Sequence, residues 1–402
     1  MKLTPRQRVL PALIACLLCT GAAHAADPTG SFTVSGFATL GLVKTDTDLA
    51  QYAIAGQTRG ADKDISAEVD SKLGLQFGAK LNNMFSGTVQ LLAKSGGDGN
   101  VKPGVEWAFV KAQLAPSVAV RLGRMGAPFF AISDFRAVGF ANTTLRPPQD
   151  VYGQVPVSHF DGADASYQAN LGVGTLTLQG FGGKSSEKFE RVDVELDRLY
   201  GINATLETDA GLTLRFGHAS GKLTVKSTSL AGLVSTLRAT PFASVGNELD
   251  ANDKKASFTG VGLTWDEGQW LVNAEYTQRR VATYLPDTAG WYVTVGRRFG
   301  SWTPYASASQ IKSVSTNVNN TVVAATPQLA QLRGIVDATL ASQQLNQKTL
   351  AIGARWDFAS NFAMKVQLDH VRPQGDAFFV QIQPGFNSRK VNVLSIAVDT
   401  VF

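Results

Sequence analysis

The stretch Ser71-Lys-Leu-Gly-Leu-Gln-Phe-Gly-Ala-Lys-Leu81 carries the pattern that decides the fold of this chain. Apolar side chains occupy every second position from Leu73 to Leu81, while Lys72, Gln76 and Lys80 share the positions between them with glycine. A period of two places alternate side chains on opposite faces of a β-strand. A strand buried between two sheets would not carry lysines on one face, so we expect one face of this strand to contact water.

The same alternation recurs along the chain, with turn-forming residues between the runs. The runs are about 8 to 14 residues long, which brackets the 9 to 11 that a tilted strand needs to cross a bilayer. Sixteen candidate strands lie near 31–43, 71–81, 85–94, 104–115, 117–124, 158–169, 172–183, 194–207, 211–222, 256–266, 269–280, 289–299, 302–312, 348–358, 361–372 and 389–402.

The connections between these runs alternate strictly between short and long. The short turns are Asn82-Asn83, Ala115-Pro116, Asn170-Leu171, Asp209-Ala210, Glu267-Gly268, Gly300-Ser301 and Ala359-Ser360. The long loops are 44–70, 95–103, 125–157, 184–193, 223–255, 281–288, 313–347 and 373–388, and the seventh of them predicts a short helix over 327–341. A soluble sandwich has no reason to sort its loops by side, whereas bacterial outer-membrane barrels have an even strand number, short periplasmic turns and longer external loops.

A closed sheet also explains how such strands could lie in lipid. Each unpaired backbone polar group in lipid costs several kcal/mol, so a sheet can span a membrane only when it closes on itself. Closure at sixteen strands leaves an aqueous lumen, which accounts for the polar face. We therefore expect an all-β fold, a closed antiparallel transmembrane β-barrel formed as one domain by 26–402.

The composition agrees with this interpretation. The 402 residues are 44% hydrophobic and only 17% charged, against about 25% charged in an ordinary soluble domain. No stretch after residue 25 approaches the roughly 20 apolar residues of a spanning helix, which excludes a helical membrane protein. Both cysteines, Cys16 and Cys19, lie near the amino end, so disulfides cannot stabilise the rest of the chain.

Residues 1–25 are typical of a signal peptide that is removed. A basic start precedes an apolar run at 9–18 and the Ala23-His24-Ala25 cleavage site. A lipoprotein-type box at 13–16 is the alternative, but its apolar segment would continue past the cleavage point. Removal of 1–25 lowers the net charge from +5 to +2, because this segment holds three basic residues and no acidic one. Such a small charge gives no support to nucleic-acid binding.

The chain resembles the general porin family of Gram-negative bacteria over essentially all of 26–402. The resemblance rests on the leader, on the opening strand Val34-Ser-Gly-Phe-Ala-Thr-Leu-Gly41, on Arg121-Leu-Gly-Arg124 and on the last strand, which ends in Phe402. It implies a homotrimeric outer-membrane channel that passes small hydrophilic solutes and ions by passive diffusion without a cofactor. It further implies that the barrel-insertion machinery reads Phe402 as an assembly signal.

In that family the third external loop, here 125–157, folds into the barrel and narrows it. This loop lacks the Pro-Glu-Phe-Gly-Gly stretch of many members, so the detailed constriction does not transfer. Its phenylalanines favour packing against the wall inside the lumen, and an external cap or a subunit contact is the alternative. The charges of the loop, which sum to zero, are Asp134, Arg136, Arg146 and Asp150.

The polar parity of the strands predicts the charged residues that line the lumen. The basic candidates are Lys72, Lys80, Arg121, Arg215, Arg279, Arg298, Arg355 and Lys365, with Arg124 added at the start of the loop. The acidic candidates are Asp164, Glu195, Asp197, Glu275, Asp357 and Asp369, whereas the parity around Glu106 and Lys111 is ambiguous. The slight basic excess predicts a weak anion preference, and Arg121→Ala should reduce it. The alternative for any single one of these residues is a solvated wall charge with no selective role.

The opposite parity carries aromatic residues suited to a lipid-facing girdle or to a trimer interface. These are Trp265, Trp270, Tyr276, Trp291, Phe299, Trp356 and Phe402.

Catalysis finds little support in the sequence. His218 and His370 fall on the apolar parity, and the sequence has neither a metal-binding His/Cys spacing nor a G-x-S-x-G motif. The alternatives to a general diffusion channel are a substrate-biased channel, an outer-membrane hydrolase that uses His159 beside Ser158 or Asp161, and a soluble exported binding protein.

Overall fold

The computed structural model describes residues 32–95, 100–190, 192–387 and 389–402. The expected signal peptide, 1–25, lies outside the described residues. No helix in the described ranges is long and apolar enough to cross a membrane.

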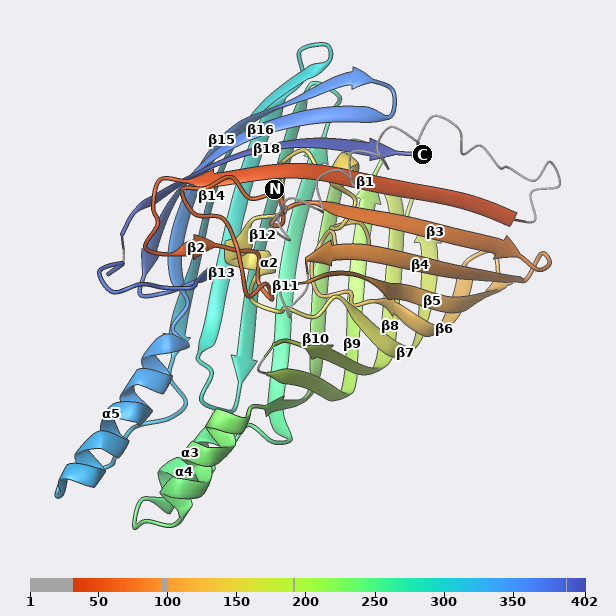
Figure 1. Ribbon diagram of the computed structural model, residues 1–402. Helices are drawn as coiled ribbons and strands as arrows, with labels where there is room; N and C mark the ends of the chain where they lie inside the picture. The colour runs from red at the N-terminus through yellow and green to blue at the C-terminus, as the bar shows by residue number, and fades with distance from the viewer. Residues whose placement is uncertain (1–31, 96–99, 191, 388) are drawn as a thin grey trace.

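Sixteen antiparallel strands of the described chain close into one barrel, as the sequence predicts (Figure 1). The strands are β1 (Phe32–Thr45), β3 (Lys72–Lys80), β4 (Phe85–Ser95), β5 (Val101–Ala115), β6 (Val118–Gly126), β7 (His159–Asn170), β8 (Gly174–Lys188), β9 (Asp193–Thr208), β10 (Leu212–Lys226), β11 (Lys254–Asp266), β12 (Trp270–Val281), β13 (Asp287–Arg297), β14 (Trp302–Ser315), β15 (Asn346–Ala359), β16 (Phe362–Gln374) and β18 (Val391–Val401). Each strand of the barrel pairs with the next, and β1 pairs with β18 to close it.

The tight turns lie where the sequence predicts them. Gly268 and Gly300 have φ angles of 98° and 61°, a left-handed backbone that glycine adopts without steric cost. The fourth long connection, expected at 184–193, is shorter than predicted, because β8 continues to Lys188 and β9 begins at Asp193. The polar residues 184–188 hide this extension, because the alternation of apolar and polar side chains is lost there.

Two irregularities change which side chains face inward. The register between β4 and β5 shifts between Gln90 and Leu91, which leaves Glu106 as the extra residue of a β-bulge. The register between β9 and β10 shifts between Ser220 and Lys222, opposite Arg198, whose φ is 49°. Beyond each irregularity, the simple count of odd and even positions no longer gives the face.

The outward face of the barrel is apolar and rich in aromatic residues. Trp302 and Trp356 stack with ring centroids 5.2 Å apart, near the ends of the strands that carry the tight turns. Arg297 lies over the rings of Trp270 and Phe299 at the same end. The predicted aromatic residues lie on this outward parity, as a girdle at a membrane interface requires.

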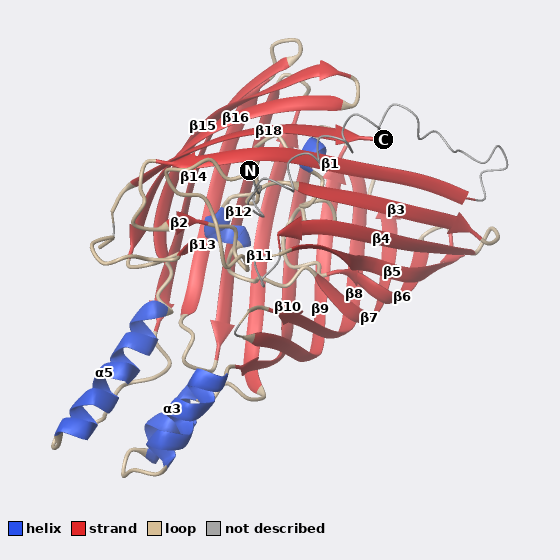
Figure 2. Cartoon of the chain, viewed as in Figure 1, coloured by secondary structure: helices blue, strands red, loops and turns tan. Residues whose placement is uncertain are grey.

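Helices at the opposite end project away from the barrel (Figures 1 and 2). They are α3 (Thr228–Arg238), α4 (Ala243–Leu249) and α5 (Pro327–Ser342), the last within one residue of the predicted helix. The Ser227 and Thr326 side chains accept hydrogen bonds from the first turns of α3 and α5. The helices share one apolar cluster that includes Leu237 and Val336.

The first and the last long connections meet at this same end of the barrel. The short strands β2 (Gln51–Tyr52) and β17 (Phe379–Val380) form a separate two-stranded sheet. This sheet covers Val43, Val371 and Val393 on the barrel wall.

Candidate functional site

The third long loop, 125–157, lies inside the barrel, where Figure 2 shows its helices η2 (Gly139–Ala141) and α2 (Gln149–Tyr152) surrounded by strands. The Phe130 ring lies 4.6 Å from that of Tyr152 and 5.0 Å from that of Phe258 on β11. The loop phenylalanines therefore pack against the inner wall, and not as an external cap.

The guanidinium of Arg146 connects this loop to the wall through several hydrogen bonds and ion pairs. Its guanidinium donates to Asp70 with Nη2–Oδ2 at 2.6 Å and to Asp369 with Nη1–Oδ2 at 3.0 Å. It also donates to Ser395 and lies over the ring of Tyr52. Only 4% of Arg146 is exposed, so this predicted constriction residue fastens the loop and does not face the open lumen.

Side chains of the barrel wall hold the short helix α2 by hydrogen bonds to its Asp150 and Tyr152. Asp150, which is fully buried, accepts hydrogen bonds from Ser309 on β14 and Gln347 on β15. Burial raises the pKa of Asp150 to about 6. Tyr152 donates to Glu275 at 2.9 Å, and Glu275 also accepts from the backbone of the loop at 3.2 Å.

Four of the predicted basic wall residues donate to backbone carbonyls of the loop. Arg215 donates to Pro128 and Phe129, Arg279 to Gln154, Arg355 to Phe140 and Asn142, and Lys365 to Gly139 and Thr144. Lys365 is completely buried and also pairs with Asp399 at 3.0 Å. These cations hold the loop in place, because they satisfy carbonyls that would otherwise be buried without a partner.

A cavity of about 210 Å³ remains between the loop and the facing wall. Lys72 on β3 and Lys94 on β4 are directly opposite each other in the register, and both line this cavity with Arg136 of the loop. Neither lysine has a carboxylate within ion-pair distance among the described residues. Asp70 also lines the cavity but is engaged by Arg146.

Other predicted residues line the lumen with a partner beside them. Arg121 on β6 forms a bidentate ion pair with Asp164 on β7 and lies over the ring of Phe109. Asp134 of the loop lies near this pair, and burial raises its pKa. Lys80 lies at the last position of β3, on the inward parity and exposed.

Four predicted pore residues lie away from the narrow part of the lumen. Arg124 lies opposite Ala108 and Asp161 in the strand register, and it faces outward because it is two positions from the outward-facing Leu122. Glu195 and Asp197 lie beyond the bulge at Arg198, which reverses their parity: Leu196, between them, lines an internal cavity instead. Arg298 pairs with Asp266 at 2.6 Å in the tight turn at the end of β13.

Some residues of the site were missed by sequence reasoning. Lys94 and Asp399 occupy inward positions on β4 and β18, so the parity rule that found Lys72 would also have found them. Asp70 lies in a loop, where no periodic signal exists.

The structure also brings together the residues of the hydrolase alternative. His159 Nδ1 lies 3.4 Å from both Ser158 Oγ and Glu187 Oε1. A catalytic triad needs the serine and the carboxylate on different ring nitrogens of the histidine, whereas here one nitrogen faces both. In addition, Ser158 and His159 are buried. Asp161 points outward to Arg124. This arrangement gives the hydrolase no support.

We compared the chain with known protein families, sequences and solved structures. A family model described as Gram-negative porin matches residues 12–372. No curated protein sequence matches the chain. Among solved structures, OmpT of Vibrio cholerae has 10% sequence identity and a TM-score of 0.54, covering 92% of this chain and 98% of that one. The anion-selective porin from Comamonas acidovorans has 13% identity and a TM-score of 0.54, covering 92% and 99%.

The outer membrane channel DcaP of Acinetobacter baumannii has 11% identity and a TM-score of 0.54, covering 92% of this chain and 97% of that one. At these identities the structures show the fold alone, whereas the family model covers nearly the whole sequence. The chain belongs to the Gram-negative porin family, and its closed barrel is an outer-membrane channel.

Proposed function

We propose that the protein forms a water-filled channel for passive diffusion of small hydrophilic solutes and ions, with a weak preference for anions. One observation carries this proposal: Lys72, Lys94 and Arg136 line the cavity beside loop 125–157, and no carboxylate pairs with either lysine among the described residues. Charges around the narrowest part of a pore determine which ions enter it.

The balance of charge at this cavity is positive. Lys188 adds a fourth cation, and Glu187 is the acidic residue of the lining that Arg146 does not engage. Glu106 lies near Lys94 and Arg136, and Asp399 lies near Lys72, so the positive excess is small, as a weak preference requires. The slight basic excess predicted from the sequence does not act through Arg146, Arg215, Arg279 and Arg355, because these side chains bind the loop itself.

Reversal potentials across a KCl gradient in planar bilayers test this proposal. We expect a small preference for chloride, and the double substitution Lys72→Gln with Lys94→Gln should reduce or abolish it. Lys63→Gln is the matched control, because Lys63 lies in an external loop and pairs with Asp48 at 3.4 Å. A clear cation preference of the unaltered protein would refute the proposal.

We further propose that the channel is a homotrimer that contacts outer-membrane lipid, with Phe402 acting as an assembly signal for the barrel-insertion machinery. A solved structure of OmpT from Vibrio cholerae, with a TM-score of 0.50, is described as a trimer form. Phe402 packs outward against Gly36, so its ring is available at the barrel surface. Native mass spectrometry of the detergent-extracted protein tests the trimer, and a monomer in mild detergent would contradict it.

A further inference from the structure

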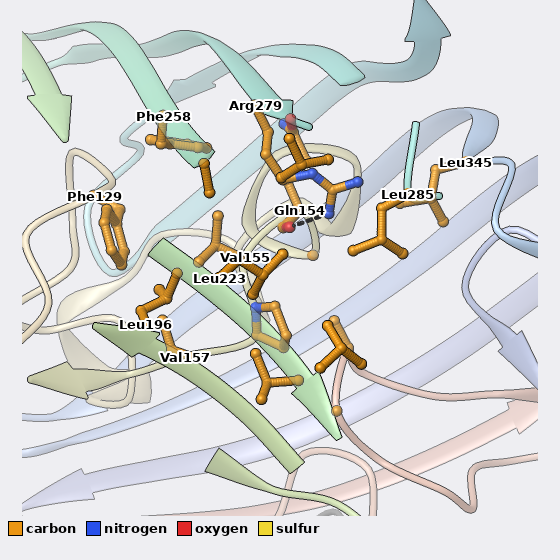
Figure 3. A pocket seen from close by; sticks show the side chains of 18 of the residues that line it. Phe129, Gln154, Val155, Val157, Leu196, Leu223, Phe258, Arg279, Leu285 and Leu345 are labelled. Atoms are coloured by element: carbon orange, nitrogen blue, oxygen red, sulfur yellow. Dashed lines mark hydrogen bonds between the residues drawn. The ribbon is translucent and has the colours of Figure 1, made fainter. Parts of the chain in front are cut away.

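A second cavity, of about 450 Å³, is lined by the end of the loop and by the barrel wall (Figure 3). Its walls are residues 153–157 of the loop and the inward faces of β9 to β12 near the long external loops. Side chains that Figure 3 labels around it are almost all hydrocarbon: Val155, Val157, Leu196, Leu223, Phe258 and Leu285. An apolar cavity of this size within a water-filled lumen is suited to a partly apolar ligand.

Arg279 is the charged residue of this lining, and its hydrogen bonding is incomplete. Nη1 donates to the Gln154 carbonyl at 2.7 Å and Nη2 to the Pro286 carbonyl at 3.1 Å. Nε is buried and has no acceptor, and no carboxylate of the described residues forms an ion pair with this guanidinium. Buried cations are normally paired with an anion, as Arg146 is with Asp70.

We propose that this cavity binds small amphipathic carboxylates, whose carboxylate lies at Arg279 and whose hydrocarbon body packs against Leu223 and Leu196. The proposal rests on the proposed function and names a substrate class for the same channel. A planar guanidinium suits a carboxylate better than a point anion does, because its donors form a fork that matches the two oxygens. Burial of a chain of about six carbons would supply the affinity that a free inorganic anion lacks.

The two cavities are neighbours that share part of their lining. Both are lined by residues 54–57 of the first loop and by Val155 and Pro156. Under this proposal, the cations Lys72, Lys94 and Arg136 lie in the cavity next to the one that holds the carboxylate. The apolar cavity selects the hydrocarbon body and the basic cavity attracts the charge, so an amphipathic cation would be disfavoured at both.

The test uses the full-length protein reconstituted in planar bilayers, with hexanoate as the probe. We expect hexanoate to reduce the KCl conductance in a saturable way, while acetate and hexylammonium at the same concentration do not. Leu223→Asn should weaken the hexanoate effect by about tenfold, the order expected when part of a buried leucine contact is lost. Ile335→Asn is the matched control, because Ile335 is exposed on α5, far in the fold from this cavity.

Arg279→Gln should weaken the effect as well, but it also removes a contact to the loop. Leu223→Asn leaves every hydrogen bond of the loop in place, so it decides the question if Arg279→Gln does not assemble. Equal effects of hexanoate and acetate, or an unchanged hexanoate effect in Leu223→Asn, would overturn the inference while the anion preference could still stand. Cation preference in KCl would instead refute the proposed function.

Discussion

Replacing Arg146 with methionine should release loop 125–157 from the wall. Methionine keeps an unbranched stem but removes the guanidinium that Asp70 and Asp369 share. Both carboxylates are only 3% exposed, so each would be left buried without its cation. Removal of one partner from a buried ion pair costs about 3 to 5 kcal/mol. Even about 3 kcal/mol shifts the balance between docked and undocked loop by roughly 150-fold.

Single-channel recording in planar bilayers measures this effect directly. An undocked loop no longer narrows the lumen in a fixed way, so we expect Arg146→Met to give a changed mean conductance and strong open-channel noise. Arg333→Met is the control, because Arg333 and Asp337 form an exposed pair at 3.8 Å on α5. Such exposed pairs contribute under about 1 kcal/mol, and this one lies outside the barrel.

A rescue experiment separates the buried charge from the lost side-chain volume. Adding Asp70→Asn and Asp369→Asn to Arg146→Met removes the stranded charges, and the quiet conductance should return at least in part. Neutral replacements of a complete buried ion cluster are often tolerated, whereas half of a cluster is not. If Arg146→Met alone conducts quietly at the level of the unaltered protein, the reasoning that this cluster anchors the loop is wrong.

Three further results are expected. Because the pKa of Asp150 is raised to about 6 from 3.8, the docked loop takes up a proton as pH falls through this window, so docking should be firmer at about pH 5 than at about pH 7. Asp150→Asn should remove that pH dependence of the open-channel noise, and a persisting dependence would contradict this. Arg124→Ala should leave ion selectivity unchanged in reversal-potential measurements, because Arg124 faces outward. Arg121→Ala should reduce anion preference, because it removes a cation and leaves the Asp164 charge unpaired, but by less than the Lys72 and Lys94 double substitution, which removes two cations; a larger effect would show that the constriction lies at β6.

Most of the fold could be predicted from the sequence because the alternation is a local signal repeated many times. The hydrophobic face of Leu73 to Leu81, the tight turn at Gly268 and the helix from Pro327 each follow from a few neighbouring residues. Closure itself required only that an edge strand in lipid is too costly to persist.

The site could be predicted only in part. The alternation of positions along a strand shows which face of the barrel wall a side chain lies on, but not which group it contacts. It predicted that Arg215, Arg355 and Lys365 face inward, but it could not show that their side chains donate to carbonyls of the loop. It failed for Glu195 and Asp197, since one bulged residue, Arg198, reverses the faces beyond it. Pairings such as Arg146 with Asp70 join segments far apart in the chain, and no local pattern encodes them.

The position of Arg146 also has a consequence for how the barrel is built. Asp70 precedes β3 on one side of the junction between β1 and β18, whereas Asp369 and Ser395 lie on the other side. Thr39 and Asp399 likewise meet across this junction, directly beneath Gly139 of the loop. A barrel that has not yet joined its first and last strands offers Arg146 only half of its partners. We therefore expect the loop to be fully seated only after β1 and β18 have paired.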